Sequence, residues 1–354
     1  MVKNSYPIQV LLVDDSQTVT RLVSQIIGED KTFRVMGIAA DPFEAVEIMK
    51  KQRPDVILLD IEMPRMNGLT FLRKIMSQHP IPVVIFSSVA PKNSYNAIKA
   101  LEYGAVAVLQ KPKLITSPEF NDIKIRFLET LRGAAEANLK MMRTAPAQNP
   151  ASHQTSVKEI SQKRIQIPSR KVIVAGASTG GTQAIEYLVK NLKQSVPGML
   201  ITQHMPGEFT KAFAERLNTF SPLLVKEAEE GEIIKNGCVY IANGFFHMMV
   251  EKTGLDYIIN LKNGPLVNRH KPSVDVLFSS VSRHVGPHAV GLLLTGMGND
   301  GATGLRKMKD AGAVTIAQDE ASSVVFGMPR AAIELNAAQK VLSLKQILNY
   351  LNSL

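Results

Sequence analysis

Two groups of residues in this chain of 354 residues could do chemistry, and they lie far apart in the sequence. The first is a set of three acids, Asp14, Asp15 and Asp60, which come at the ends of apolar runs. The second is Ser178 in the glycine-rich stretch Gly176-Ala177-Ser178-Thr179-Gly180. Clustered carboxylates can hold a divalent cation and accept a phosphoryl group, whereas an exposed serine hydroxyl can act as a nucleophile. The chain therefore offers two candidate sites of different kinds.

The acid cluster is predicted from the strands that precede it. The apolar runs are typical of buried parallel strands, and such strands place ligands at one edge of their sheet. Three carboxylates at one spot repel one another unless a cation lies among them, and hard oxygen ligands suit Mg²⁺. Ser87 and Lys111 follow two further strands and would offer a hydroxyl and a positive charge to a phosphoryl group on Asp60. Acids at strand ends also cap helices, but the whole set favours a phosphoryl site.

The sequence around these groups resembles the receiver domain of two-component response regulators. The matching stretches are Leu12-Val13-Asp14-Asp15, residues 58–68 and Lys111-Pro112. The resemblance implies that Asp60 is the phospho-acceptor, with a histidine kinase as phosphodonor. It also implies that Asp14, Asp15, Asp60 and the main-chain carbonyl of Glu62 form a Mg²⁺ site, and that Ser87 and Lys111 are the receiver's switch and phosphate-contact residues. Val108 stands where many receivers carry an aromatic residue, so an aromatic rotamer switch is not assumed.

The serine site is more ambiguous when it is taken alone. A G-x-S-x-G turn between a strand and a helix exposes a serine, but a glycine-rich turn can equally cradle the phosphates of a dinucleotide. A dinucleotide site predicts an acid at the end of the next strand, whereas His204 stands there. Histidine is suited to act as a general base beside a serine. Asp300 ends another apolar run, in a glycine-rich turn whose backbone N–H groups could stabilise an oxyanion.

The second half of the chain resembles the chemotaxis protein-glutamate methylesterase family. The resemblance rests on five stretches, which are residues 176–181, 203–206, 269–275, 295–301 and 327–329. It implies that Ser178 is the nucleophile, His204 the base and Asp300 its partner. Thr179 and the Met297 amide would lie near the oxyanion, and we include Arg269 among the substrate contacts.

That resemblance implies a phosphorylation-controlled hydrolase of chemotactic adaptation. It would demethylate glutamate γ-methyl esters on the cytoplasmic helices of chemoreceptors, releasing methanol, and would deamidate glutamines, with no cofactor in the esterase site. We expect the receiver to cover this site until Asp60 is phosphorylated, although it could instead only recruit the enzyme to its receptor. The alternative from another class is a receiver fused to a non-enzymatic nucleotide-binding signalling module.

Composition limits the partners. Residues 113–170 carry 10 Lys and Arg against 5 Asp and Glu, which is half of the net charge of +10. The chain has no tryptophan and no basic run with interleaved aromatics, so we expect no nucleic-acid binding. No apolar run approaches the roughly 20 residues that span a bilayer, so we expect no membrane insertion. The single cysteine, Cys238, fits a core position and a reducing cytoplasm, and we expect a cytoplasmic monomer.

The alternation of strands and helices predicts two α/β domains. Residues 1–125 should form a five-stranded, parallel, doubly wound receiver of the flavodoxin-like kind, with strands at 8–13, 33–39, 56–59, 82–86 and 105–109. Residues 126–169 should hold the end of a helix and a linker, because 143–169 lose all periodicity. Residues 170–354 should form a doubly wound, mainly parallel catalytic domain. Its strands are expected at 171–175, 198–203, 238–242, 289–295 and 313–317, with an added hairpin at 246–250 and 256–261.

Overall fold

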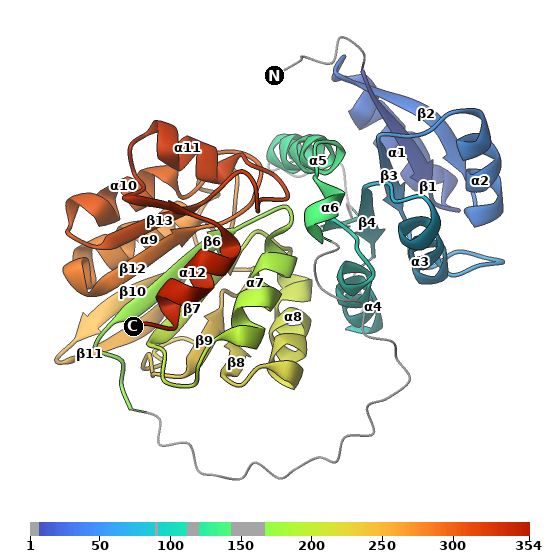
Figure 1. The fold of residues 1–354 in the computed structure, drawn as a ribbon. Helices are drawn as coiled ribbons and strands as arrows, with labels where there is room; N and C mark the ends of the chain where they lie inside the picture. Colours follow the sequence, from blue (N-terminus) through green and yellow to red (C-terminus); the bar gives the residue numbers. More distant parts are fainter. Residues whose placement is uncertain (1–6, 89–90, 112–119, 143–166) are drawn as a thin grey trace.

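The computed structural model describes residues 7–88, 91–111, 120–142 and 167–354, and it contains two α/β units (Figure 1). Each unit has its own sheet, and helix α5 (Phe120–Ala135) lies between the two sheets. Most of the expected linker falls in residues 143–166, which are outside the described residues. None of the described helices is long and apolar enough to cross a membrane.

The first sheet has the strand order β2-β1-β3-β4-β5, and every neighbouring pair is parallel. Its strands are β1 (Ile8–Val13), β2 (Phe33–Ala39), β3 (Val56–Leu59), β4 (Val83–Ser87) and β5 (Ala107–Gln110). The remaining helices of this unit are α1 (Gln17–Gly28), α2 (Pro42–Lys51), α3 (Gly68–Gln78), α4 (Pro91–Glu102) and the short α6 (Leu139–Met142). All residues of β3 are buried, as expected when helices cover both faces of a parallel sheet.

The second sheet has seven strands in the order β14-β13-β12-β6-β7-β9-β8, and its neighbouring pairs are also parallel. The strands are β6 (Val172–Ala177), β7 (Gly198–Gln203), β8 (Leu224–Glu227), β9 (Cys238–Ile241), β12 (Ala289–Leu293), β13 (Val314–Gln318) and β14 (Lys340–Leu342). The expected hairpin is present as antiparallel β10 (His247–Thr253) and β11 (Asp256–Lys262). The predicted fold class is therefore confirmed for both units.

Two edge strands, β8 and β14, were not predicted from the sequence. They are four and three residues long, and two of the three residues of β14 are exposed. Short edge strands bury too few apolar side chains to stand out as a pattern. The helices of this unit are α7 (Gly181–Asn191), α8 (Gly207–Phe220), α9 (Val274–His284), α10 (Ala302–Asp310), α11 (Met328–Glu334) and α12 (Leu344–Leu351), with a 3-10 turn η1 (Gly286–His288).

The two units pack against each other through α4 and α5 of the first. Buried apolar residues of α4 and α8 belong to one continuous cluster that includes one face of each sheet. At the edge of this contact the Arg216 guanidinium on α8 pairs with Glu102 of α4 and, at 3.0 Å, with Glu186 of α7. Tyr95 of α4 donates a hydrogen bond to Glu215 of α8. The interface is thus apolar at its centre and charged at its rim.

Candidate functional site

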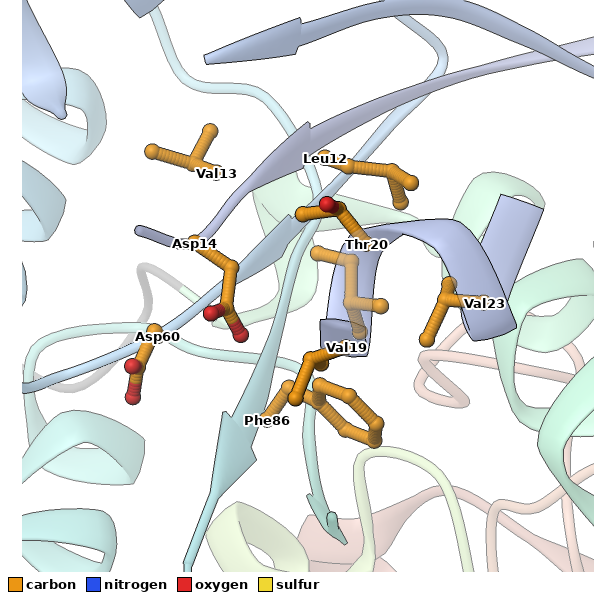
Figure 2. Close-up of a pocket in the computed structure, with 9 residues that line it drawn as sticks. Leu12, Val13, Asp14, Val19, Thr20, Val23, Asp60 and Phe86 are labelled. Carbon is orange, nitrogen blue, oxygen red and sulfur yellow. The ribbon is translucent and has the colours of Figure 1, made fainter. Parts of the chain in front are cut away.

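The acids of the first unit meet at the carboxyl end of its sheet. Asp14 follows β1 and Asp60 follows β3, the neighbouring strands between which the strand order reverses. Figure 2 shows the side chains of Asp14 and Asp60 near each other. Carboxylate oxygens of Asp14, Asp15 and Asp60 all lie within 4.8 Å of one another. The side chains of Asp14 and Asp60 are buried, whereas Asp15 is exposed. Such a reversal point is where open α/β sheets bind ligands.

Lys111 lies among these acids. Its Nζ is 2.6 Å from Asp14 Oδ2 and 2.7 Å from Asp60 Oδ2. Burial raises the pKa of the Asp60 carboxyl, and the ammonium of Lys111 opposes that rise without cancelling it. Burial would lower the pKa of Lys111, but its hydrogen bonds to the two carboxylates raise it above the ordinary value, so the amine stays charged. One ammonium cannot balance three carboxylates, and the hard oxygen donors of this cluster fit a Mg²⁺ ion.

The other two predicted receiver residues lie next to the cluster. Ser87 ends β4 and is buried, and its main-chain carbonyl accepts a hydrogen bond of 2.9 Å from the Lys111 amide. The Ser87 hydroxyl donates to the Ser88 carbonyl at 3.3 Å. The side chain of Glu62 is exposed, and its amide donates to Asp60 Oδ1 at 3.3 Å. These residues are therefore neighbours of Asp60 in space.

The serine of the second unit stands on a tight strand-to-helix turn. β6 ends at Ala177, and the Ser178 amide donates to the Thr295 carbonyl at 3.0 Å. The Gly181 amide donates to the Ser178 carbonyl at 2.7 Å and closes the turn. Gly180 has a φ of 76°, in the left-handed region, and a side chain there would collide with Val324. Glycine is thus needed at this position, and the turn separates Ser178 from the start of α7.

His204 and Asp300 come to the same sheet edge from β7 and β12, the strands on either side of β6. His204 Nε2 lies 2.9 Å from Asp300 Oδ2, and both side chains are buried. The other ring nitrogen, Nδ1, is also buried and makes no hydrogen bond to a described residue. Because Nε2 is engaged by Asp300, Nδ1 is the nitrogen left to accept a proton from a serine. No hydrogen bond joins the Ser178 hydroxyl to His204 among the described residues, and such contacts often tighten only when substrate binds.

The Asp300 carboxylate is surrounded by donors. Besides His204 it accepts from Asn268 Nδ2 at 2.8 Å, the Ser273 hydroxyl at 2.8 Å, and the amides of Val274 and Asp275 at 2.7 and 3.2 Å. Burial alone would raise the pKa of this carboxyl. The hydrogen bond and charge of His204 and the other donors outweigh burial and hold the pKa of Asp300 well below its usual range. Asp300 is therefore an ionised partner that can stabilise an imidazolium on His204.

Ser178, Thr179, His204 and His270 line one cavity of about 560 Å³. Thr179 is anchored through its carbonyl, which accepts a hydrogen bond of 3.0 Å from the Thr295 hydroxyl. Met297 lies in the glycine-rich loop after β12, and its amide donates to no other described residue. The preceding residue, Gly296, lies against Ser178, since a Cβ atom added to it would lie 2.7 Å from Ser178 Cβ. A free backbone N–H near a serine is the group that an oxyanion needs.

The receiver unit forms the opposite wall of this cavity. Phe120, Phe127 and Thr130 of α5 line it together with the serine and the histidines. A Cβ atom on Gly133 of α5 would lie 3.1 Å from Met297 Cβ and 3.3 Å from Thr179 Oγ1, so the helix backbone almost touches the candidate oxyanion loop. Farther along, the Asn138 amide donates to the Val324 carbonyl at 2.9 Å. Helix α5 therefore forms part of the wall of the cavity that holds Ser178 and His204.

Arg269 also meets α5. Its guanidinium lies 3.3 Å from the Glu129 carboxylate, and about half of the Arg269 side chain is exposed. The predicted substrate contact is thus paired with a carboxylate of the receiver unit.

Sequence reasoning missed three residues that complete this site. Asn268 and Ser273 bind Asp300 from a loop that is distant in sequence, and nothing in their own types indicates such a role. His270 is only partly exposed, and its ring stacks on His204. The one available signal was that all three belong to or adjoin the matching stretch 269–275.

The two sites define a class of protein, a phosphoryl-accepting receiver joined to an α/β unit with the side chains of a serine hydrolase. The model of the response regulator receiver domain matches residues 10–117, and that of CheB methylesterase matches residues 173–351. A protein-glutamate methylesterase/protein-glutamine glutaminase of Geobacter metallireducens is 47% identical over 96% of this chain and 97% of its own length. Another of that name, from Anaeromyxobacter dehalogenans, is 48% identical over 96% of this chain and 95% of its own length.

A solved structure agrees with these matches. The Thermotoga maritima CheB methylesterase catalytic domain is 38% identical, with a TM-score of 0.51, and covers 52% of this chain and 97% of its own. The chain belongs to the CheB methylesterase family.

Proposed function

We propose that this chain is a phosphorylation-activated protein-glutamate methylesterase of chemotactic adaptation. It hydrolyses glutamate γ-methyl esters on the cytoplasmic helices of chemoreceptors and deamidates glutamines at such positions. The observation that carries the proposal is the near-full-length identity of 47% to a methylesterase/glutaminase. The cavity that holds Ser178 and His204 supports it with a suitable set of side chains. A non-enzymatic nucleotide-binding module gains no support, since residues 173–351 match the methylesterase model.

The first half of the reaction is acyl transfer to the enzyme. The Ser178 hydroxyl attacks the ester carbonyl carbon while His204 Nδ1 accepts the hydroxyl proton, and Asp300 stabilises the resulting imidazolium through Nε2–H. The Met297 amide, with Thr179 beside it, stabilises the negative oxygen of the tetrahedral intermediate. The C–OCH₃ bond then breaks, His204 gives its proton to the leaving methoxide, and methanol departs. Ser178 is left as an acyl ester of the receptor glutamate.

The second half restores the serine. A water molecule gives a proton to His204 Nδ1 and attacks the acyl carbon, and the Ser178 oxygen leaves with the proton of the imidazolium. The products are a glutamate carboxylate with its released proton and the free enzyme. For a glutamine substrate the leaving group is ammonia in place of methanol, and the same residues serve.

Control comes from the receiver. Asp60 accepts the phosphoryl group from a histidine kinase, and Ser87 and Lys111 contact it. Asp14, Asp15, Asp60 and the Glu62 carbonyl would hold Mg²⁺, which would neutralise charge on the phosphoryl donor. In the unphosphorylated protein α5 covers the esterase cavity. The charge that phosphorylation adds at Asp60 reshapes the surface formed by β4 and β5, and this displaces α5. The contacts of Gly133 and Glu129 with the catalytic unit support this covering role.

The remaining parts of the proposal concern organisation. We propose a monomer of the cytoplasm with a receiver over residues 1–125, a helix end and linker over 126–169, and a catalytic domain over 170–354, with no cofactor in the esterase site. The single, buried Cys238 supports a reducing compartment. The proposed receiver ends at residue 125, which falls inside α5. Most of α5 would thus lie in the connecting segment of the sequence, although the helix packs with the receiver.

The test is the fate of methylated receptor peptides. Wild-type protein should remove one CH₂ unit of mass from each methylated glutamate, and Ser178→Ala should leave the peptides unchanged. A Ser178→Ala protein that keeps the wild-type rate would show that another group is the nucleophile. A wild-type protein that changes neither esters nor amides would reject the proposed activity.

A further inference from the structure

A two-residue turn beside the active site holds its side chains in a fixed relation. The Val267 amide donates to the His270 carbonyl at 3.0 Å, and the His270 amide donates back to the Val267 carbonyl at 2.9 Å. The residues between them, Asn268 and Arg269, have φ values of 50° and 64°, both in the left-handed region. Two positive φ values are typical of the tightest hairpin turn, and asparagine tolerates them better than most residues. Such backbone strain persists when the surrounding contacts over-determine it.

Asn268 ties this turn to the acid of the active site. Its amide nitrogen donates to Asp300 Oδ1 at 2.8 Å and to Asp275 Oδ2 at 2.7 Å. Asp275 is fixed in turn, because it accepts a hydrogen bond of 2.5 Å from the Gly304 amide at the start of α10. The turn therefore cannot shift without breaking hydrogen bonds to two carboxylates.

The ring of His270, the last residue of the turn, stacks on the ring of His204. The ring centroids are 3.7 Å apart and the ring planes differ by 24°, which is a stacked arrangement. The hydrogen bond from Nε2 to Asp300 fixes one atom of the His204 ring, but the Cβ–Cγ torsion of histidine is soft. A flat ring on its face restricts the remaining rotation. Rotation of His204 would move Nδ1 away from the proton that it must accept.

Burial is the main reason that His270 stays neutral. His204, Asp300, Arg126 of α5 and Arg269 surround it, and burial is the largest influence. Burial, and then the charge that His204 carries when it is protonated, lower the pKa of His270, against the opposing effect of Asp300. The neutral form of the ring is therefore favoured, and it presents an uncharged aromatic surface to His204. A neutral ring face stabilises an imidazolium stacked on it, whereas a second charge would oppose the proton transfer.

We propose that His270 is a positioning residue of the esterase site. The Asn268–Arg269 turn holds the His270 ring against His204, so that Nδ1 of His204 stays directed at Ser178. His270 lines the same cavity as Ser178, and in the proposed role it acts through the His204 ring and exchanges no proton itself. This inference rests on the proposed role of His204 as base.

The test compares His270→Phe, which keeps a flat ring, with His270→Leu, which keeps apolar volume without one. Both are made in the full-length protein, and methanol release is measured across pH with acetyl phosphate present. We expect His270→Phe to retain kcat within about threefold of wild type, with the same acid limb of kcat/KM against pH. We expect His270→Leu to lose about 10- to 100-fold in kcat with little change in KM, because misplacement of a catalytic group by 1 Å can cost this much.

Other outcomes overturn the inference in recognisable ways. A His270→Phe protein as slow as His270→Leu, or with a lost acid limb, would show that His270 exchanges protons. A raised KM at unchanged kcat in both variants would make it a substrate contact. Failure of the Ser178→Ala control to stop methanol release would instead reject the proposed function itself.

A readout independent of turnover completes the test. The Nε2–H proton of His204, hydrogen-bonded to Asp300, should give a far-downfield NMR resonance that is sharp in wild type and His270→Phe. The same resonance should broaden or vanish in His270→Leu. An equally sharp signal in His270→Leu would show that the stack does not fix the ring.

Discussion

The replacement Gly133→Leu should activate the unphosphorylated enzyme. At Gly133 α5 lies close to the catalytic loop, since an added Cβ would lie 3.1 Å from Met297 Cβ and 3.3 Å from Thr179 Oγ1. Because the Cβ atom alone already makes tight contacts, the three further carbons of leucine should push α5 away from this loop. Overpacking of this kind costs about 1–3 kcal/mol, which shifts the equilibrium toward the open form by roughly 5- to 150-fold. The unphosphorylated rate should rise by that factor until most molecules are open.

The fold should tolerate the change, because leucine is better than glycine in a helix by up to about 1 kcal/mol. Gly28→Leu is the matched control, since Gly28 is also helical and nothing lies within 4 Å of its added Cβ. The assay is the initial rate of methanol release from methylated receptors without a phosphodonor, compared with the rate after acetyl phosphate. The phosphorylated rates of both variants should stay near wild type. An unphosphorylated Gly133→Leu rate equal to that of Gly28→Leu would refute the role of α5 as a cover.

Four further outcomes are expected. Asp60→Asn should abolish labelling by acetyl phosphate and keep basal esterase activity, and stoichiometric labelling of that variant would move the phospho-acceptor elsewhere. Ser178→Ala and the Ser178→Ala/His204→Ala double variant should have nearly equal residual rates, because the two residues serve one step; losses that multiply would argue against a shared proton transfer. Glu129→Gln removes a half-exposed ion pair worth about 0–1 kcal/mol, so the unphosphorylated rate should rise by no more than about fivefold, and a fall would contradict a covering role for this contact. The pKa of Asp300 is lower in the folded protein than in the unfolded chain. Its ionisation therefore stabilises the fold above the ordinary carboxyl pKa of about 3.9, and this stabilisation is lost as the pH falls toward the folded-state pKa. The difference in unfolding free energy between wild type and Asp300→Asn should therefore shrink between about pH 5 and pH 2, and a constant difference would contradict the assignment.

The sequence could predict the parts of the site that are built on strand ends. Asp60, Ser178 and Asp300 each follow a buried apolar run. Parallel strands bring such positions to one edge of their sheet, and this does not depend on the conformation of the connecting loops. The fold class followed from the same alternation of strands and helices. For these residues local pattern and global topology agree.

The remaining parts depend on contacts that no local pattern records. Asn268 and Ser273 reach Asp300 across 32 and 27 residues, and their types are common in any loop. The sequence could not place His270 against His204, because a ring stack has no sequence period. A glycine such as Gly133 destabilises a helix, so its helix propensity does not explain why it stands in α5. The explanation is the close approach of Met297 and Thr179 of the other unit. The short edge strands β8 and β14 bury too little to be detected.

Phosphodonor-dependent release of tritiated methanol from methylated chemoreceptor membranes, followed side by side for wild type, Asp60→Asn and Ser178→Ala, tests the central claim most directly. A serine esterase held closed by its receiver predicts that acetyl phosphate with Mg²⁺ accelerates the wild type, leaves Asp60→Asn at its basal rate, and does nothing for an inactive Ser178→Ala. Acceleration of Asp60→Asn equal to that of wild type, or methanol release by Ser178→Ala at the wild-type rate, would contradict it.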